Sequence, residues 1–458
     1  MKDNTKKTMP LRLLKLLHLI ITTLIFTFFW RSYYISQVDG YIMNIDQYPI
    51  NLIYMALLFV LNRIYSSYAV GVSRVSEIIL SLSLADFVAA VLFYNFIAIL
   101  RMSFAGLLPL GALLIVQFLF NVLWSLNMNT FYFKLNKPKR TAVIYSNDDD
   151  LRKLLSINCF SDKFKLEKRI KNPESIEQAI NEVIGCKAIF VVGISASLRN
   201  SISNYCVENG IEGYIQPEVG DVLMAGAKHI QMFSMPIFHV HKAAPSPEYL
   251  FIKRLFDLLF SSVALLAFSP LMLFIALAVK LGDGGPVLYK QVRLTKNGKE
   301  FNILKFRSMR VDAECGGPCL STQNDCRITP VGKKIRAARL DELPQLFNIL
   351  KGDMTIVGPR PERPEIASQY AETIPAFSLR LQVKAGLTGY SQVCGRYNTE
   401  PYDKLEMDLM YINRMSVMED LRLMVATLKT LFLKESSQGV PERQEMAVEP
   451  AKRVEISE

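Results

Sequence analysis

The stretch that decides the fold is "LFIKRLFDLLFSSVALLAFSPLMLFIALAVKLGDGGP", residues 250–286. Residues 258–279 of this run carry no charged side chain. As a straight helix they would extend roughly 33 Å at about 1.5 Å per residue, which is enough to cross a bilayer. A crossing would place residues 281–458 on the far side of the membrane, so the topology of the C-terminal part depends on this run.

Two features of the run argue against a crossing. Lys253 and Arg254 mark its start and Lys280 marks its end, and basic residues at both ends indicate that both lie in the cytoplasm. Ser269-Pro270 lies at the midpoint, where proline removes a helix hydrogen bond and serine can bond back to a freed carbonyl. We therefore predict a re-entrant hairpin that enters one leaflet and returns. The alternative is a spanning helix with a proline kink.

Four further apolar runs precede this one, and each is near the ~20 residues that a transmembrane helix needs. They lie at 16–30, 47–62, 78–100 and 102–127, and the second is short. Basic residues gather in the N-terminal tail, in the second connection and after the fourth run. This pattern predicts a four-helix anchor over residues 1–133 in the inner or plasma membrane, with both ends cytoplasmic.

Asp86 lies inside the third apolar run. An ionisable group at that depth is a functional candidate by default. A single carboxylate cannot define a transport path, so we favour the interpretation that Asp86 is paired with other helices of the anchor.

Residues 134–248 differ in character from the anchor. TAVIYS (141–146) and KAIFVVGIS (187–195) are β-branched runs typical of buried parallel strands, and a helical pattern lies between them. This alternation predicts a small Rossmann-like α/β domain. The first strand is followed by NDDD (147–150) in place of a glycine-rich turn. Three acids would repel a pyrophosphate, so we expect a structural or regulatory domain without a dinucleotide.

The bulk composition limits the classes of partner and compartment. The net charge of +11 suits anionic partners such as lipid headgroups, phosphates or nucleic acid, although nucleic-acid binding would not explain the run at 250–286. Seven cysteines without disulfide-like spacing indicate a reducing compartment. Cys315, Cys319 and Cys326 invite a zinc site, but their irregular spacing favours a reduced loop. The tail 434–458 is polar, which predicts disorder.

Two adjacent acids, Asp341 and Glu342, open the segment "RLDELPQLFNILKGDM" (339–354) at the start of a predicted helix. Acids favour a helix N-terminus, which would explain one of them. The pair also suits a Mg²⁺ site completed by substrate phosphates. A carboxylate can attack phosphorus once the repulsion between the two anions is screened, so the pair is a candidate catalytic and metal site.

Basic residues surround this pair in the sequence. The segment "YKQVRLTKNGKEFNILKFRSM" (289–309) predicts two strands joined by a turn at 296–299. The candidate phosphate-binding residues are Arg293, Lys305, Arg307, Arg336 and Arg360. Arg360 lies between two prolines, which restrict its backbone. Arginines bind phosphate in a bidentate fork, so this collection could neutralise a diphosphate; a basic surface on anionic lipid is the alternative.

At this point a resemblance becomes clear. The motifs KRLFD, SP, KFRSM, RLDELPQLFNILKGDM, VGPRPERP, KAGLTGYSQVCGR and DLMYI follow one another between about 250 and 433. In this region the chain closely resembles the bacterial polyprenyl-phosphate glycosyl-1-phosphate transferases. The anchor and the Rossmann-like insert resemble the large members that initiate exopolysaccharide or capsule synthesis. Ala385 stands where many relatives have proline, which predicts a looser turn.

The resemblance implies a reaction. A UDP-sugar donates sugar-1-phosphate to undecaprenyl phosphate in the bilayer, UMP leaves, and Mg²⁺ assists. The nucleophile falls on Asp341, which suggests a ping-pong scheme, and Glu342 falls on the residue that helps to hold the metal. Pro359, Arg360 and Pro361 take a phosphate-contacting role, and Ser269 and Pro270 take the hairpin break.

Other readings stay open at this stage. A non-catalytic membrane scaffold for polysaccharide assembly is the main rival, although the intact Asp341-Glu342 pair and Arg360 argue against it. A nucleotide-sugar dehydratase would need a glycine-rich fingerprint that is missing after TAVIYS. The identity of the sugar, and whether the chain is a monomer or a homodimer, are not fixed by the sequence.

Overall fold

The computed structural model describes residues 2–34, 47–103, 106–155, 160–232, 235–243, 245–310, 327–395 and 400–432. The chain divides into two compact units, Met1–Gln216 and Pro217–Glu458. The zinc alternative at Cys315, Cys319 and Cys326 and the polar tail 434–458 both fall outside the described residues.

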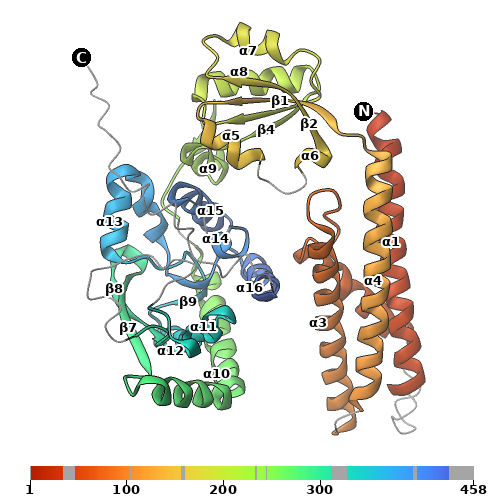
Figure 1. Cartoon of the computed structure of the whole chain (residues 1–458), viewed down its shortest axis with the longest axis vertical. Helices are drawn as coiled ribbons and strands as arrows, with labels where there is room; N and C mark the ends of the chain where they lie inside the picture. The colour runs from red at the N-terminus through yellow and green to blue at the C-terminus, as the bar shows by residue number, and fades with distance from the viewer. Residues whose placement is uncertain are drawn as a thin grey trace. The chain divides into compact units, whose positions relative to one another are not determined.

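The first unit begins with long apolar helices (Figure 1). They are α1 (Lys2–Phe29), continued by the π-helical turn η1 (Trp30–Tyr34), then α2 (Gln47–Ile64), α3 (Val75–Arg101) and α4 (Leu107–Leu135). The segments 9–34, 75–99 and 107–135 are long and apolar enough to cross a membrane, whereas the apolar part of α2, 48–64, is shorter. The chain is therefore a membrane-integral protein with a helical anchor near its N-terminus.

The interior of the anchor contains polar side chains that bond to one another. Asn121 of α4 donates to Asp86 of α3 at 2.7 Å, and its amide oxygen lies 3.0 Å from Nε2 of His18 on α1. Gln117 donates to the hydroxyl of Tyr54 at 3.0 Å. Asp86 is thus paired inside the bundle, as we expected, and the helices are joined by interhelical hydrogen bonds.

A four-stranded parallel sheet in the order β2-β1-β3-β4 follows in the same unit. Its elements are β1 (Lys139–Tyr145), α5 (Asp148–Leu155), α6 (Phe160–Lys163), β2 (Phe164–Lys171), α7 (Ile176–Val183), β3 (Ala188–Val192), α8 (Ala196–Glu208) and β4 (Glu212–Ile215). Side chains of β1 alternate between the faces: Ala142 and Ile144 pack with α7 and α8, and Val143 and Tyr145 pack with α5 and α6. Helices therefore cover both faces, as Figure 1 shows.

The three aspartates of the NDDD segment, Asp148, Asp149 and Asp150, form the first turn of α5. Asp148 pairs with Lys171 at 2.6 Å. Acids at this helix N-terminus occupy the place where a nucleotide-binding domain would receive a phosphate.

The second unit begins with α9 (Val219–Ala225), β5 (Lys228–Met232) and β6 (Met235–His239), where β5 and β6 form an antiparallel hairpin. Val222 of α9 is buried with Leu405 and Leu409 in the core of this unit. Residues 217–248, which the sequence grouped with the preceding α/β domain, lie in this second unit.

The remaining elements of the second unit build its C-terminal part. They are α10 (Pro247–Asp283), β7 (Leu288–Leu294), η3 (Lys296–Gly298), β8 (Glu300–Phe306), α11 (Pro330–Ala337), η4 (Leu340–Glu342), α12 (Gln345–Lys351), β9 (Thr355–Val357), α13 (Pro364–Thr373), η5 (Pro375–Gln382), β10 (Gly386–Thr388), α14 (Tyr390–Val393), α15 (Pro401–Asn413) and α16 (Val417–Phe432). Strands β7 and β8 are antiparallel, and the positive φ of Asn297 and Gly298 closes their turn. Strands β9 and β10 pair in parallel.

Helix α10 holds the apolar run and changes direction part-way along (Figure 1). Pro270 cannot donate to the carbonyl of Leu266, and the hydroxyl of Ser269 donates to that carbonyl instead, at 2.9 Å. Segment 247–282 is also long and apolar enough to cross a membrane. The run is thus a bent helix in which serine satisfies the group that proline leaves free.

Both halves of α10 contact the same unit. In the first half, Arg254 donates to the carbonyls of Ile349 and Leu350 at 2.7 and 2.8 Å. In the second half, Ile275 and Val279 pack in one buried cluster with Phe306 and Ile335. The two halves of the bent helix therefore both pack against the rest of the second unit.

Candidate active site

The acidic pair lies on a short 3-10 turn, η4, and not in the first turn of α12 as the sequence had suggested. Pro344 separates the turn from α12 and has no N–H with which to continue the hydrogen-bond ladder. Arg339, just before the turn, has a positive φ of 54°. A left-handed residue that is not glycine is uncommon and favours a functional position, here the entry to the acidic pair.

Glu342 is held by two cations. Its Oε1 accepts a hydrogen bond from Nη2 of Arg360 at 2.8 Å and lies 3.5 Å from Nζ of Lys305. Burial alone would raise the pKa of Glu342, but Arg360, Lys305 and Arg339 outweigh burial and lower this pKa to about 2. Glu342 therefore stays ionised under all physiological conditions.

Asp341 has the opposite balance. Its pKa is raised, first by burial and then by the negative charge of Glu342, although Lys305, Arg336 and Arg360 oppose the shift. Among the described residues, Arg360 and Lys305 dominate at Glu342, whereas burial and the charge of Glu342 dominate at Asp341, so the pKa values of the two neighbouring carboxylates shift in opposite directions. Such a split is typical of acids that take part in chemistry.

The side chain of Asn348 fixes α12 against strand β8, which carries Lys305. Its amide oxygen accepts from the N–H of Leu304 at 2.9 Å, and its nitrogen donates to the carbonyl of Asn302 at 2.8 Å. Because Asn348 is buried, these bonds set the position of α12 relative to the strand. Lys305 is thereby placed opposite Glu342.

The Pro359-Arg360-Pro361 segment is held by the β9–β10 pair. The N–H of Gly358 donates to the carbonyl of Thr388 at 2.8 Å, and that of Gly386 donates to the carbonyl of Pro359 at 2.9 Å. A Cβ on Gly386 would lie 2.1 Å from the nitrogen of Gly358, so the two backbones approach too closely for any side chain there.

Ala385, which stands where we expected a looser turn, is hydrogen-bonded through its backbone. Its N–H donates to the hydroxyl of Thr295 at 3.1 Å, and that hydroxyl donates in turn to the carbonyl of Asp353 at 3.1 Å. Proline has no N–H and could not make the first of these bonds. The substitution therefore replaces the stiffness of proline with a hydrogen bond.

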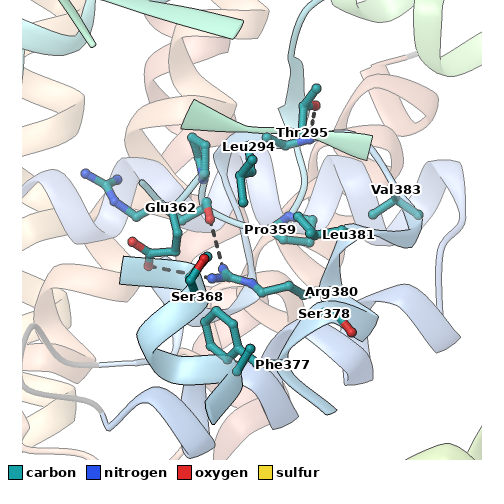
Figure 2. Close-up of a pocket in the computed structure, with 15 residues that line it drawn as sticks. Leu294, Thr295, Pro359, Glu362, Ser368, Phe377, Ser378, Arg380, Leu381 and Val383 are labelled. Atoms are coloured by element: carbon teal, nitrogen blue, oxygen red, sulfur yellow. Dashed lines mark hydrogen bonds and ion pairs between the residues drawn. The ribbon is translucent and has the colours of Figure 1, made fainter. Parts of the chain in front are cut away.

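A cavity of about 180 Å³ lies beside this segment, between α13, η5 and the end of β7 (Figure 2). Its wall is mostly apolar and includes Leu294, Pro359, Ala371 and Leu381. Arg380 also lines it, although only 3% of this side chain is exposed.

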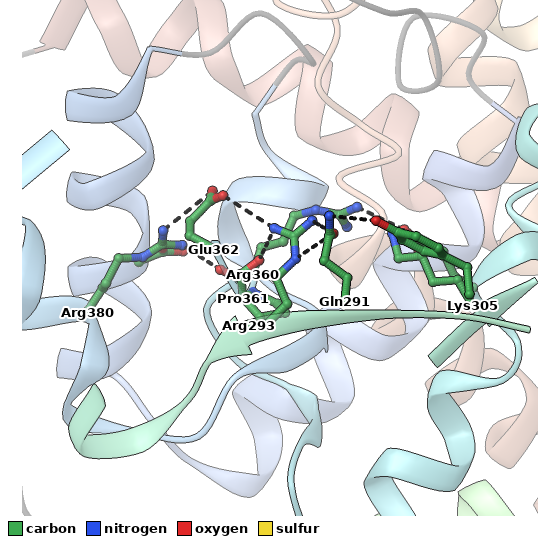
Figure 3. A network of polar contacts seen from close by, with 10 residues as sticks. Gln291, Arg293, Lys305, Arg360, Pro361, Glu362 and Arg380 are labelled. Carbon is green, nitrogen blue, oxygen red and sulfur yellow. Dashed lines mark hydrogen bonds and ion pairs between the residues drawn. The ribbon is translucent and has the colours of Figure 1, made fainter. Parts of the chain in front are cut away.

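Polar contacts link this cavity wall to the acidic pair (Figure 3). Arg380 pairs with Asp408 at 2.6 Å and donates to the backbone carbonyl of Arg360 at 2.8 Å. Arg293 donates to the carbonyl of Pro361 at 3.0 Å and lies 3.7 Å from Glu362. Two arginines therefore fix the backbone on either side of the Arg360 side chain, which reaches Glu342.

The other predicted site residues are placed as follows. Arg336 acts on Asp341 through its charge. Arg307 is buried against Gly285, and a Cβ on that glycine would lie 1.8 Å from Nη1 of Arg307, so Arg307 packs next to the end of α10.

Lys253 donates to the carbonyl of Val357 at 2.9 Å and pairs with Asp420 at 2.7 Å. Lys253 and Arg254 thus attach α10 to the unit in addition to marking its basic start.

Comparison with known proteins gives the family. The family model described as bacterial sugar transferase matches residues 248–434. The exopolysaccharide production protein PSS of Rhizobium leguminosarum bv. phaseoli is 39% identical over 188 residues, which are 39% of this chain and 94% of that protein. The chain belongs to the bacterial sugar transferase family. The match begins in α10 and ends just after α16, so the family region contains the acidic pair, the Pro-Arg-Pro segment and the cavity.

Longer bacterial sugar transferases match over the same region. The UDP-N-acetylgalactosamine-undecaprenyl-phosphate N-acetylgalactosaminephosphotransferase of Aeromonas hydrophila is 41% identical over 204 residues, 43% of this chain and 48% of that protein. The UDP-glucose:undecaprenyl-phosphate glucose-1-phosphate transferase of Klebsiella pneumoniae is 42% identical over 190 residues, 40% of this chain and 41% of that protein. The matched region therefore spans less than half the length of these two relatives.

Several polar residues of this bacterial sugar transferase were missed by sequence reasoning. Arg380, Asp408 and Glu362 complete the network behind Arg360, and Lys404 acts on Glu362 through its charge. They are far apart in sequence, and no local spacing connects them. The sequence did contain a signal for Asp257, because a carboxylate between apolar residues indicates a buried polar partner. In the structure Asp257 accepts a hydrogen bond from the hydroxyl of Thr355 at 2.8 Å.

Proposed function

We propose that this protein transfers sugar-1-phosphate from a UDP-sugar to undecaprenyl phosphate, releases UMP, and thereby begins the synthesis of an exopolysaccharide or capsule. The observation that carries the proposal is the acidic pair, in which Glu342 is tied to Arg360 and Lys305 while Asp341 is not hydrogen-bonded to either. The names of relatives with 41% and 42% identity support the classes of donor and acceptor.

The proposed mechanism has two displacements at Asp341. The ionised carboxylate oxygen attacks the β-phosphorus of the donor, the bond from that phosphorus to the bridging oxygen breaks, and UMP leaves with the electron pair. A phosphate oxygen of undecaprenyl phosphate then attacks the same phosphorus and releases the Asp341 carboxylate. Arg360 and Lys305 screen the repulsion between carboxylate and phosphates, a role typically worth several kcal/mol of barrier.

The residues fit a Mg²⁺ site that substrate phosphates complete. Two adjacent carboxylates are present, and in the part of the chain that the structure describes no group of three His, Cys, Asp or Glu side chains could hold a metal alone. Mg²⁺ commonly binds through one or two carboxylates plus phosphates, so Asp341 and Glu342 would hold it. When bound, the metal would neutralise phosphate charge near the attacked phosphorus.

We also propose that α10 is re-entrant and that the catalytic region faces the cytoplasm at the inner or plasma membrane. The contacts of both halves of α10 with one unit support this, because a straight crossing would separate Arg254 from Val279 by the bilayer. Exposed apolar residues along the bent helix, such as Phe251, Leu266 and Phe274, suit contact with one leaflet. The acidic pair would then lie where a soluble donor and a lipid phosphate can meet.

The proposed domain assignment follows from these points. Residues 1–133 form the anchor, 134–248 a Rossmann-like structural or regulatory domain whose last part, 217–248, lies in the second unit, 249–433 the hairpin with the catalytic domain, and 434–458 a polar tail. The covered parallel sheet β2-β1-β3-β4 supports the second of these. A monomer and a homodimer are both compatible with this assignment.

The test offers a panel of UDP-sugars to the purified full chain with undecaprenyl phosphate and Mg²⁺ and measures the release of UMP. The expected result is release with one or a few sugars, which also identifies the sugar. Exchange of labelled UMP into the UDP-sugar without lipid acceptor should occur and should be lost in Asp341→Asn. Full activity of Asp341→Asn would rule out the covalent scheme, and no UMP release with any donor would leave the scaffold function in its place.

A further inference from the structure

The cavity beside the Pro-Arg-Pro segment is too small for a whole nucleotide sugar. Its volume is about 180 Å³. Pockets that enclose a drug-sized ligand usually measure roughly 300–1,000 Å³. The cavity can therefore receive one ring of a larger ligand, while the rest of that ligand lies outside it.

The cavity lies in line with the charged groups of the site. In Figure 3, Arg380 and Glu362 lie at one end, Arg293 and Arg360 in the middle, and Lys305 at the other end, where it faces Glu342. Arg380 and Glu362 line the cavity, and Arg360 both lines it and reaches the acidic pair. An apolar hollow, a cationic stretch and the acidic pair thus follow one another within the reach of one arginine side chain.

The polar groups in the cavity wall are a donor beside an acceptor. Arg380 is 97% buried, and among the described residues no group accepts a hydrogen bond from its Nη1. That nitrogen lies 3.6 Å from Oε1 of Glu362, so an ion pair is present without a hydrogen bond. A buried donor without an acceptor is costly, typically about 1–3 kcal/mol, and a bound carbonyl oxygen would satisfy it.

We propose that this cavity is the subsite for the pyrimidine base of the donor, with Arg380 donating to a base carbonyl and Glu362 accepting from a neighbouring N–H. A pyrimidine has flat apolar faces, which match the wall of Pro359, Ala371 and Leu381, and a polar edge, which matches the Arg380–Glu362 pair. The diphosphate then lies along Arg293 and Arg360 and brings the β-phosphorus to Asp341.

This inference rests on the proposed function, because it locates where the base of the UDP-sugar donor would bind. The test measures binding of UMP to the purified full chain, which requires no turnover. Ala371 is exposed at the cavity wall, so Ala371→Trp fills the space without removing a buried group. Gln369→Trp is the matched control, because Gln369 is exposed on the same helix and does not line the cavity. The thermal midpoint of each variant checks that it is folded.

We expect Ala371→Trp to weaken UMP binding at least about tenfold, which corresponds to about 1.4 kcal/mol, and to leave binding of inorganic pyrophosphate unchanged. Gln369→Trp should bind UMP as the parent protein does. In the parent protein, UMP should bind at least about tenfold more tightly than ribose 5-phosphate, which lacks the base. This last comparison needs no variant, so it still tests the base subsite if Ala371→Trp fails to fold.

Equal binding of UMP and ribose 5-phosphate, or unchanged UMP binding in folded Ala371→Trp, would overturn the subsite. Either result can occur while the parent protein still turns over a UDP-sugar, in which case only the subsite is lost. If the parent protein turns over no UDP-sugar, the proposed function is lost, and the UMP measurement separates that outcome from a failure of the subsite.

Discussion

Helices α4 and α10 are both long and strongly apolar, and either could cross a bilayer by length and composition. Their buried polar groups differ in partners. Asn121 and Gln117 of α4 bond to side chains of other anchor helices. Lys253 and Asp257 of α10 bond to strand β9 and helix α16 of the second unit. The apolar composition of a helix therefore shows only that it can contact lipid. The partners of its polar side chains show whether it belongs to the anchor or to the second unit.

The sharpest contrast is between the carboxylates of the two regions. Asp341→Asn should lower UMP exchange at least about a thousandfold, because an amide is a far weaker nucleophile and carries no charge. Asp86→Asn, in the anchor, should leave exchange within about twofold of the parent, since an amide oxygen can still accept from Asn121. Exchange of labelled UMP into a UDP-sugar measures both. A large loss in Asp86→Asn would mean that the anchor takes part in the chemistry.

The second contrast concerns stability. Asp257 accepts from the hydroxyl of Thr355 and the N–H of Ile356, so Asp257→Ala leaves two buried donors without an acceptor and should cost about 2–4 kcal/mol of unfolding free energy. Asn121→Ala removes two interhelical hydrogen bonds, to Asp86 and His18, and should cost only about 1.2 kcal/mol, since each such bond is typically worth about 0.6 kcal/mol. Thermal unfolding in detergent compares the two. Equal losses would show that α10 is held no differently from the anchor.

The pH dependence tests the electrostatics of the acidic pair. Asp341 must be ionised to attack, and its pKa is raised by burial and by Glu342, so exchange should fall as the pH drops through that raised pKa. Glu342→Gln removes a negative neighbour, and this lowers the pKa of Asp341 and moves the acid limb to lower pH. The pH profile of the exchange that remains in Glu342→Gln measures this shift. If the acid side of the profile moved to higher pH, the titrating group would not be Asp341.

The smallest expected effect is at the bend of α10. Ser269→Ala removes the hydroxyl that donates to the carbonyl of Leu266 and should cost no more than about 1 kcal/mol, because Pro270 still prevents a regular helix. Ser269→Thr, which keeps the hydroxyl, is the control. The thermal midpoints of the two variants should differ by a few degrees at most. A large loss in Ser269→Ala would mean that serine, and not proline, maintains the bend.

The sequence predicted those parts of the molecule that depend on local pattern. The apolar runs, the strands at 141–146 and 187–195, the β7–β8 hairpin and the acidic pair beside basic residues were all visible, because periodicity, turn residues and charge are local signals. The acids themselves were expected in a helix, and Pro344 places them on a separate turn.

The supporting groups of the site could not be predicted in this way. Arg380 and Asp408 lie 28 positions apart, and their pairing depends on how η5 packs against α15. Lys305 and Arg307 lie two positions apart, and on one continuous strand they would share a face. Strand β8 ends at Phe306, so Arg307 lies beyond it. Here the approach of Gly285 buries Arg307 elsewhere.

The central claim is that α10 enters the membrane and returns, so that its two ends lie on the same side. It is tested most directly by single cysteines at Glu248 and Leu281 in a cysteine-free background, labelled with a membrane-impermeant maleimide in right-side-out and inverted vesicles. A cysteine at Met102, exposed between α3 and α4, reports the external side. We predict that Glu248 and Leu281 are labelled only in inverted vesicles and Met102 only in right-side-out ones. Labelling of Leu281 from the outside would contradict the account.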